Sequence, residues 1–95
     1  MTHRQTLIEL TATSLDRRQI ITVDEHRINS LAESLARHQG GGLWDWWLTT
    51  DMTNRSWQMF CTAVIKRINN RRRQRPFEDL IVLDKSTVRS GPIWW

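Results

Sequence analysis

Cysteine is almost absent from this chain of 95 residues, since Cys61 has no second cysteine with which to form an internal disulfide or a metal site. No apolar run reaches the roughly 18 to 20 residues that span a bilayer, and the first ten residues lack the apolar stretch of a signal peptide. The chain also has no internal repeat and no low-complexity linker. These absences argue against a zinc finger and a membrane protein, and they predict a soluble, cytoplasmic protein with no membrane partner.

Patterns of catalytic residues are missing as well. His3, His26 and His38 are scattered along the sequence, and Cys61 falls on an apolar helical stripe, where an inert core thiol is the usual role. The glycines at 40–42 lack the lysine and the serine or threonine of a phosphate-binding loop. We therefore expect no enzymatic activity, no cofactor and no bound metal.

The length of the chain allows one small domain, residues 1–95. A chain of this size buries only about 60 to 65% of its unfolded surface. Its core is therefore small, and a second copy in a homodimer, or another partner, would supply part of it. The six tryptophans, each burying about 200 Å², together with the apolar share of 39% argue against a disordered chain.

Two stretches have the spacing of amphipathic helices. The first is predicted at about residues 24–38, after a T-x-x-E capping box from Thr22 to Glu25. The second is predicted at about residues 54–70, and its apolar positions show the strongest periodicity in the chain. About fifteen residues separate the two helices, whereas a helix-turn-helix motif uses a link of three or four.

The remaining segments predict short strands. Residues 6–13 and 19–23 favour a hairpin, although leucines in the same region also fit a helical stripe. A further strand is predicted at the apolar run 80–83, and the glycines at 40–42 must end the first helix and open a mobile Gly- and Trp-rich connection at 40–50. The expected fold class is α+β, two helices flanked by short strands, with a mostly α fold as the alternative.

Acidic residues are missing from the segment between Arg55 and Arg75, which holds seven basic residues. The rest of the chain has seven basic and ten acidic residues, so the segment carries +7 and the remainder −3. Six of the seven basic residues are arginines, whose planar guanidinium groups suit paired contacts with phosphate or carboxylate. Charge segregation on this scale indicates a polyanion or an acidic partner.

The segment 71–75 is predicted to lie outside the core. On a continued helix Arg71 and Arg72 would rotate onto the apolar side, where unpaired arginines are not tolerated. Either the helix ends near Asn69 and Asn70, or it projects beyond the body with arginines on all sides. Both alternatives leave the arginines exposed.

Two interpretations of the arginine run stay open. Basic residues in the last turn of a helix interact with its dipole by about 0.3 to 1 kcal/mol each, which accounts for Lys66 and Arg67 as a solvated helix end. Four further arginines within five positions favour a binding site. Over some five residues the run resembles the arginine-rich motifs of RNA-binding peptides in phage antitermination and retroviral export proteins, and this resemblance implies contacts with phosphates.

Tryptophans are the other candidates for an interface. Trp44, Trp46 and Trp47 cannot all face one way on a helix or a strand, so they either close the core or form an anchor patch for a partner protein. Trp94 and Trp95 at the end of the chain pack on the domain, contact a second chain or stack on bases.

Two hypotheses of function follow. The first is a small non-enzymatic regulatory protein that binds DNA or RNA through its arginine-rich segment. The second is an accessory protein of the kind that phages, satellites and plasmids encode, which inhibits or redirects a repressor, a polymerase or a defence complex. The residues that would bind nucleic acid, or an acidic surface of a partner, are Lys66, Arg67, Arg71, Arg72, Arg73 and Arg75. The candidates for a protein interface are Trp44, Trp46, Trp47, Trp94 and Trp95.

Overall fold

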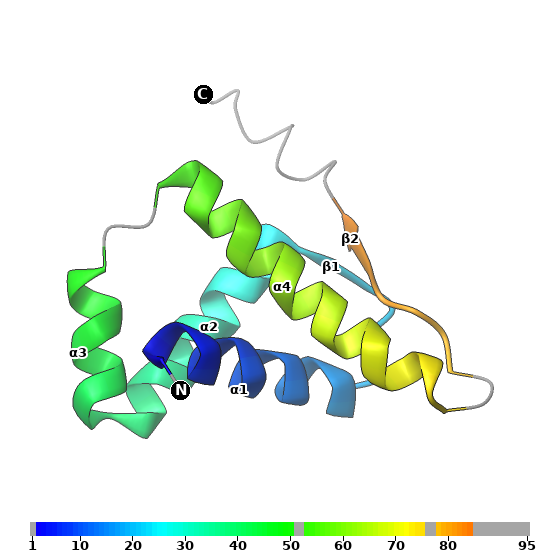
Figure 1. Cartoon of the computed structure of the whole chain (residues 1–95), viewed down its shortest axis with the longest axis horizontal. Coiled ribbons are helices and arrows are strands. Elements are labelled where there is room, and N and C mark those ends of the chain that lie inside the picture. The colour runs from blue at the N-terminus through cyan, green and yellow to red at the C-terminus, as the bar shows by residue number, and fades with distance from the viewer. Residues whose placement is uncertain (1, 51–52, 76–77, 85–95) are drawn as a thin grey trace.

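The computed structural model describes residues 2–50, 53–75 and 78–84, and these form four helices and two short strands (Figure 1). In chain order the elements are α1 (His3–Arg17), β1 (Thr22–Asp24), α2 (Glu25–Gln39), α3 (Gly41–Thr49), α4 (Asn54–Arg73) and β2 (Val82–Asp84). The two predicted helices are confirmed as α2 and α4. Because α1 and α3 are additional, the described part of the chain is mainly helical, with a small parallel sheet.

Helix α1 occupies the region for which the sequence leaves a hairpin and a helix open. Its start is fixed by a capping box, in which the Thr2 hydroxyl accepts from the Gln5 amide and the Gln5 side chain accepts from the Thr2 amide. Leu7 and Leu15, two turns apart, are fully buried on one face. The hairpin is therefore wrong, because burial of a helical stripe outweighs the weak strand preference of the β-branched residues in this region.

The start of α2 is set by Asp24. Its carboxylate accepts a hydrogen bond of 2.7 Å from the Arg27 amide. The capping box predicted from Thr22 and Glu25 does not form, because Thr22 lies in β1 and the chain enters the helix only after Asp24. The predicted end of this helix is confirmed at Gly40, whose φ of 68° lies in the left-handed region that glycine adopts without strain.

A helix, α3, replaces the mobile connection expected at residues 40–50. It begins directly after the turn at Gly40, and Leu43 on its first turn enters the core. Gly42 approaches the ring of His3 so closely that an added Cβ would lie 3.2 Å from His3 Cε1. The start of α3 is thus packed against the start of α1.

Helix α4 is longer than predicted. The Thr53 hydroxyl caps its first turn by accepting from the Ser56 amide at 3.2 Å. Its apolar stripe is fully buried and consists of Phe60, Cys61, Val64 and Ile68. The end predicted near Asn69 and Asn70 is wrong, because the helix continues through Arg73.

The asparagine that was expected to end α4 instead anchors β2. Asn69 Nδ2 donates to the Ile81 carbonyl at 3.0 Å, and Asn69 Oδ1 accepts from the Ile81 amide at 2.8 Å. Ile81 is buried beneath this pair of bonds. The strand predicted from the apolar run 80–83 is present in part, and it pairs with β1 in parallel, with Val23 opposite Leu83.

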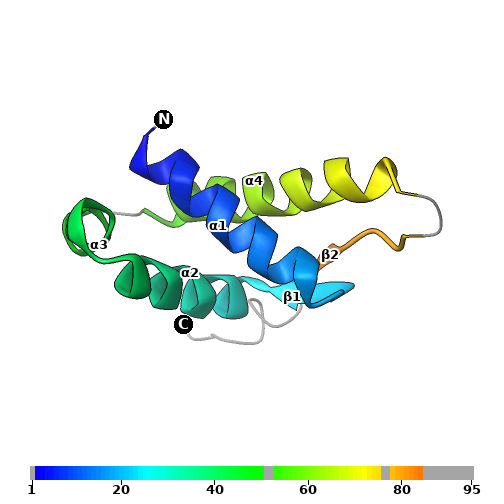
Figure 2. The same ribbon diagram turned by 90° about the horizontal axis from the view of Figure 1, so that it is seen from below.

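The helices pack around α1. Helix α4 lies on one side of α1 and α2 on the other, as Figure 2 shows, and α1 contacts both. Helix α3 covers one end by contacting α2 and α1, and the β1–β2 pair lies away from it. None of the helices in the described ranges has the length and apolarity that crossing a bilayer requires.

Candidate functional site

Two carboxylates of α1 organise the arginines of α4. Glu9 and Asp16 are seven residues, or about two helical turns, apart, which places them on one side of α1. That side faces the C-terminal half of α4. Glu9 pairs with two arginines of α4, and Asp16 pairs with one arginine of α4 and with Arg75, two residues after the end of the helix. Four arginines, Arg67, Arg71, Arg72 and Arg75, are therefore compensated from another helix.

Glu9 holds two arginines that are one turn apart. Arg67 Nη1 lies 2.9 Å from Glu9 Oε2, in an ion pair without the alignment of a hydrogen bond, and Arg71 Nη2 pairs with Glu9 Oε1. Arg71 Nη1 also donates to the Thr13 hydroxyl at 3.0 Å. The side chains of Arg67 and Arg71 are 49% and 34% exposed, so both guanidinium groups stay partly open to solvent.

Asp16 holds the next pair, Arg72 and Arg75. Arg72 Nε donates to Asp16 Oδ1 at 3.0 Å, and Arg75 Nη2 donates to both carboxylate oxygens at 2.8 and 2.9 Å. Arg75 Nε also lies 3.7 Å from Glu78 Oε1. The Arg75 side chain remains 46% exposed, whereas Asp16 is nearly enclosed.

Arg72 is buried, with its side chain 1% exposed, so the prediction that all of segment 71–75 is exposed is wrong at this position. Its charge is tolerated because Asp16 compensates it and because Arg72 Nη1 donates to the carbonyls of Ile20 and Asp79 at 2.7 and 3.1 Å. The prediction assumed that Arg72 has no partner, because Asp16 lies 56 residues away in the sequence and nothing near Arg72 indicates the pairing. Arg72 is better explained as a structural residue than as one that meets a ligand.

The ionisation of Asp16 reflects its two partners. Burial of the carboxyl group favours its neutral form, but hydrogen bonds from Arg72 and Arg75 and their positive charges outweigh this effect. The pKa of Asp16 is therefore lowered from the ordinary value of an aspartate. The carboxylate stays charged at neutral pH and keeps both arginines in place.

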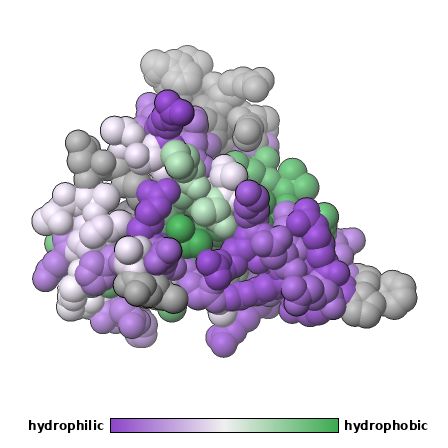
Figure 3. Space-filling view, viewed as in Figure 1, coloured by the Kyte–Doolittle hydropathy of each residue, from purple (hydrophilic) through white to green (hydrophobic). Residues whose placement is uncertain are grey.

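A shallow groove of about 410 Å³ runs along the exposed side of α4. We call it the α4 groove, and its lining residues are Ala63, Lys66, Arg67, Asn70, Arg71 and Gln74. They form two rows at a spacing of four residues, and the small side chain at Ala63 leaves one end open. Hydrophilic side chains gather over this half of α4 and the adjoining part of α1, as Figure 3 shows.

Charge is divided between two parts of the structure. Residues 2–18 and 53–75, which contain α1 and α4, hold ten basic residues and two acidic ones, a net charge of +8. The other described residues, 19–50 and 78–84, hold two basic and seven acidic residues, a net charge of −5. The fold therefore gathers positive charge on the α1–α4 side, beyond what the sequence segment alone indicates.

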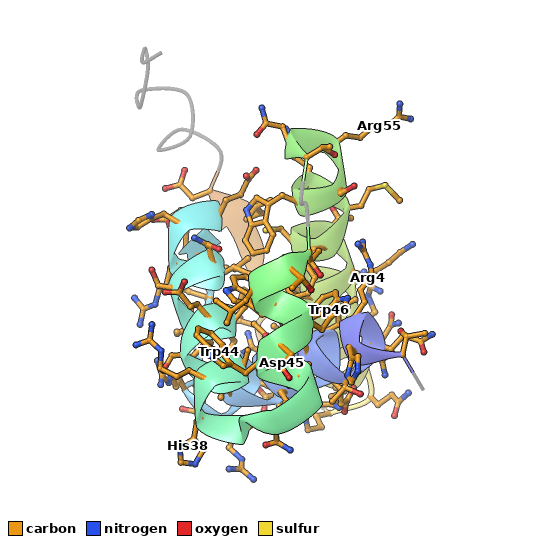
Figure 4. All side chains as sticks on the ribbon, turned by 90° about the vertical axis from the view of Figure 1, so that its left-hand side faces the viewer. Arg4, His38, Trp44, Asp45, Trp46 and Arg55 are labelled. Carbon is orange, nitrogen blue, oxygen red and sulfur yellow. The ribbon has the colours of Figure 1, made fainter. Side chains whose placement is uncertain are left out.

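The three tryptophans of α3 point in different directions, and all three are half-buried. Trp44 turns toward α2, where the guanidinium carbon of Arg37 lies 5.2 Å from its ring, and Trp46 turns toward α1, 6.3 Å from the His3 ring (Figure 4). Trp47 lies 6.3 Å from Trp57 of α4. These residues do not form one patch, and Trp44 and Trp46 contact neighbouring helices. The other two candidates, Trp94 and Trp95, lie outside the described residues.

Cys61 sits in the core, as its place on the apolar stripe predicts. Burial raises the pKa of its thiol to about 12, with a smaller contribution from the negative charge of Glu25. The thiol is therefore neutral and a poor nucleophile at physiological pH. In the described parts of the chain, no three histidine, cysteine, aspartate or glutamate side chains are grouped as a metal ion would need.

Four residues of this region were missed from the sequence: Glu9, Asp16, Asn70 and Gln74. The first two carried a usable signal, since carboxylates seven apart share one face of a helix. That signal depends on choosing a helix for the N-terminal region. The two amides had no signal of their own, because their place in the α4 groove follows from the helix continuing past residue 70.

Comparisons with known proteins return no relative of this chain. No protein-family model, no curated protein and no solved structure matches it. Its function is therefore argued from the arrangement of its own side chains.

Proposed function

We propose that this chain is a small non-enzymatic regulatory protein that binds nucleic acid along the α4 groove. The observation that carries the proposal is the composition of the groove, which combines Lys66, Arg67 and Arg71 with the amides of Asn70 and Gln74 and has no acidic residue among its described lining residues. Cations of this kind neutralise phosphates, and amides hydrogen-bond to base edges or to the backbone.

The pairing with α1 supports this proposal rather than opposing it. Glu9 compensates one of the two charges of Arg67 and Arg71, so the group keeps a net positive charge. The carboxylate also fixes the direction of both side chains, which reduces the conformational entropy that binding would otherwise cost. A guanidinium group held on one edge still has donors on its other edge for a phosphate.

The remaining cations extend the surface toward the end of α4. Arg73 is exposed and bonds only to the neighbouring Asn70 side chain at 3.3 Å among the described contacts, and Arg75 is about half exposed. Lys66 forms no ion pair within the described residues. Of the six basic residues predicted for a binding site, five are exposed or partly exposed, which supports the proposal, and Arg72 is buried.

Binding should depend on salt through the α4 cations specifically. For Lys66→Ala/Arg73→Ala we expect the slope of log affinity against log salt to fall by about two units, because two phosphate contacts are lost. The measurement is fluorescence anisotropy with a labelled 20-base-pair DNA duplex and an RNA of the same sequence, from 50 to 300 mM salt. A matched control, Arg27→Ala/Arg37→Ala, removes the same charge from α2 and should leave the slope nearly unchanged. Equal losses in both variants, or no binding by the parent chain, would contradict the proposal.

Removing the negative charge at position 9 should strengthen binding, because a glutamine carbonyl can still accept from Arg71 and keep its direction while the charge that opposes a phosphate is gone. In Glu9→Gln the arginines lose their charge partner, so affinity for the duplex should rise several-fold at low salt, since one more positive charge is uncompensated. The free energy of unfolding should fall by less than about 1 kcal/mol, because the pair is one-third to one-half exposed. Anisotropy and urea denaturation of the same preparation test both effects. Weaker binding at unchanged stability would contradict this expectation, and it would mean that Glu9 contributes more by orienting Arg67 and Arg71 than it costs by its negative charge.

A further inference from the structure

A second hollow lies where α2, α3 and α4 meet, on the side of the molecule seen in Figure 4. We call it the indole pocket, and it is lined by Asn29, Trp47, Thr50 and Trp57. Its volume is about 360 Å³. The rings of Trp47 and Trp57 stand at 75° to each other with centroids 6.3 Å apart, so they form two walls of a corner.

One wall of the pocket is fixed by the core. Trp57 stacks on Phe60 with a centroid distance of 5.0 Å and an interplanar angle of 12°, and Phe60 is fully buried. One face of the Trp57 ring is thus covered by Phe60, and the ring is held in place. A rigid aromatic wall binds a ligand at a low cost in conformational entropy.

The polar groups of the pocket are suited to a cation. Asn29 is exposed and has a side-chain carbonyl that can accept a hydrogen bond, and the Thr50 hydroxyl oxygen keeps a lone pair although it donates to the Trp46 carbonyl. No lysine or arginine is among the lining residues in the part of the chain that the structure describes. A corner of two indole rings with nearby oxygen acceptors makes a site at which a guanidinium group can pack against a ring and donate.

Acidic residues flank the pocket along α2. Glu25 and Glu33 are one turn before and one turn after Asn29, on the same helical face. Glu25 lies near enough to α4 for its negative charge to contribute to the raised pKa of the Cys61 thiol. Three of the four lining residues belong to the part of the chain with a net charge of −5, and Trp57 belongs to α4, so the α2 and α3 side of the pocket favours a basic ligand over an anionic one.

The same protein already contains a contact of the proposed kind. On the neighbouring part of α2 and α3, the Arg37 guanidinium carbon lies 5.2 Å from the centre of the Trp44 ring. An arginine of the chain itself thus stacks on a tryptophan of α3, three residues before Trp47. The indole pocket offers two tryptophans, and its described lining contains no such internal cation.

We propose that the indole pocket binds an arginine side chain of a basic peptide segment in a partner protein. The guanidinium group stacks on Trp57, Asn29 accepts from it, and Glu25 and Glu33 attract the basic residues on either side. The site is separate from the α4 groove, because Trp57 lies on the first turn of α4, whereas the lining of the groove begins at Ala63, six residues or about 9 Å further along the helix. Nucleic acid and a basic partner would therefore occupy different parts of this helix.

The test is a titration followed by the indole N–H resonances in 15N-labelled protein, assigned with Trp47→Phe and Trp57→Phe. The probe is a blocked peptide of three arginines alternating with glycines, and its control has citrulline, the neutral isostere, in place of arginine. We expect saturable shifts of the Trp47 and Trp57 resonances with a Kd on the order of 0.1 to 1 mM. The citrulline peptide should bind at least tenfold more weakly.

Variants locate the binding. Asn29→Ala should weaken it several-fold, and Glu25→Gln/Glu33→Gln should weaken it further and reduce its salt dependence. Lys66→Ala, in the α4 groove, should leave it unchanged. The proposal is overturned if citrulline binds as well as arginine, if all indole resonances shift alike, or if none shifts at 10 mM peptide. Because no nucleic acid is present, the outcome does not depend on the function of the α4 groove.

Discussion

Asp16→Ala is expected to lower the free energy of unfolding by about 3 to 5 kcal/mol, because it leaves Arg72 as a buried charge without its partner. A domain of this size has only about 5 to 15 kcal/mol of stability in total. The variant should therefore lose a large share of the stability of the parent chain. Urea denaturation followed by far-ultraviolet circular dichroism measures the change directly.

A double variant separates this explanation from a general loss of packing. In Asp16→Ala/Arg72→Met the buried charge is gone as well, and part of the lost stability should return. Glu78→Ala is a matched single control, because its carboxylate lies 3.7 Å from Arg75 at the surface and should contribute less than about 1 kcal/mol. A double variant no more stable than Asp16→Ala would argue against the buried pair as the cause.

The same pair gives a pH dependence with a defined sign. The pKa of Asp16 is lowered in the folded protein, so its contribution to stability is fully present above the pKa of an unfolded aspartate, about 3.9. It is lost as the pH falls below that value and through the lower pKa of the folded state. The free energy of unfolding of the parent chain should therefore drop below about pH 4, and Asp16→Asn should show a smaller drop.

Phe60→Ala is expected to lower the free energy of unfolding by about 3 to 5 kcal/mol through the cavity it leaves in the core. Trp57 loses its stacked partner at the same time, which adds to the cost by about 0.5 to 1.5 kcal/mol. Thermal unfolding followed by tryptophan fluorescence detects both the lost stability and the changed surroundings of Trp57. Met59→Ala is the control, since that side chain is 59% exposed and should shift stability by no more than about 0.5 kcal/mol. Equal effects at positions 59 and 60 would contradict the placement of Phe60 in the core.

The part of the fold that the sequence predicts well is the part with local signals. Helices α2 and α4 have apolar residues at a helical period, and Gly40 ends the first of them where a glycine is needed. Helix α3 is missed because three adjacent glycines resemble a hinge, although only Gly40 and Gly41 have a positive φ and the chain continues from them directly into the helix. The parallel pairing of β1 with β2 has no local signal, since it joins residues 60 apart.

The candidate site is predictable in composition but not in arrangement. The excess of arginine identifies the C-terminal half of α4 without knowledge of the fold. Which arginine is buried depends on Asp16, and no local pattern connects positions 16 and 72. An unpaired arginine cannot be buried on the apolar side of a helix, and from this rule the sequence predicts that Arg72 is exposed. The prediction is wrong because Asp16 of α1 supplies the partner.

The ion pairs between α1 and α4 also bear on the order in which the protein folds as it is synthesised. Glu9 and Asp16 meet their arginines across 56 to 62 residues of chain. At about 5 to 20 residues per second, roughly 3 to 12 seconds separate the synthesis of each carboxylate from that of its partners. Contacts of such long range close late and slow the folding of the chain. Helix α1 is therefore made first, but it acquires its charge partners only after the ribosome has completed α4.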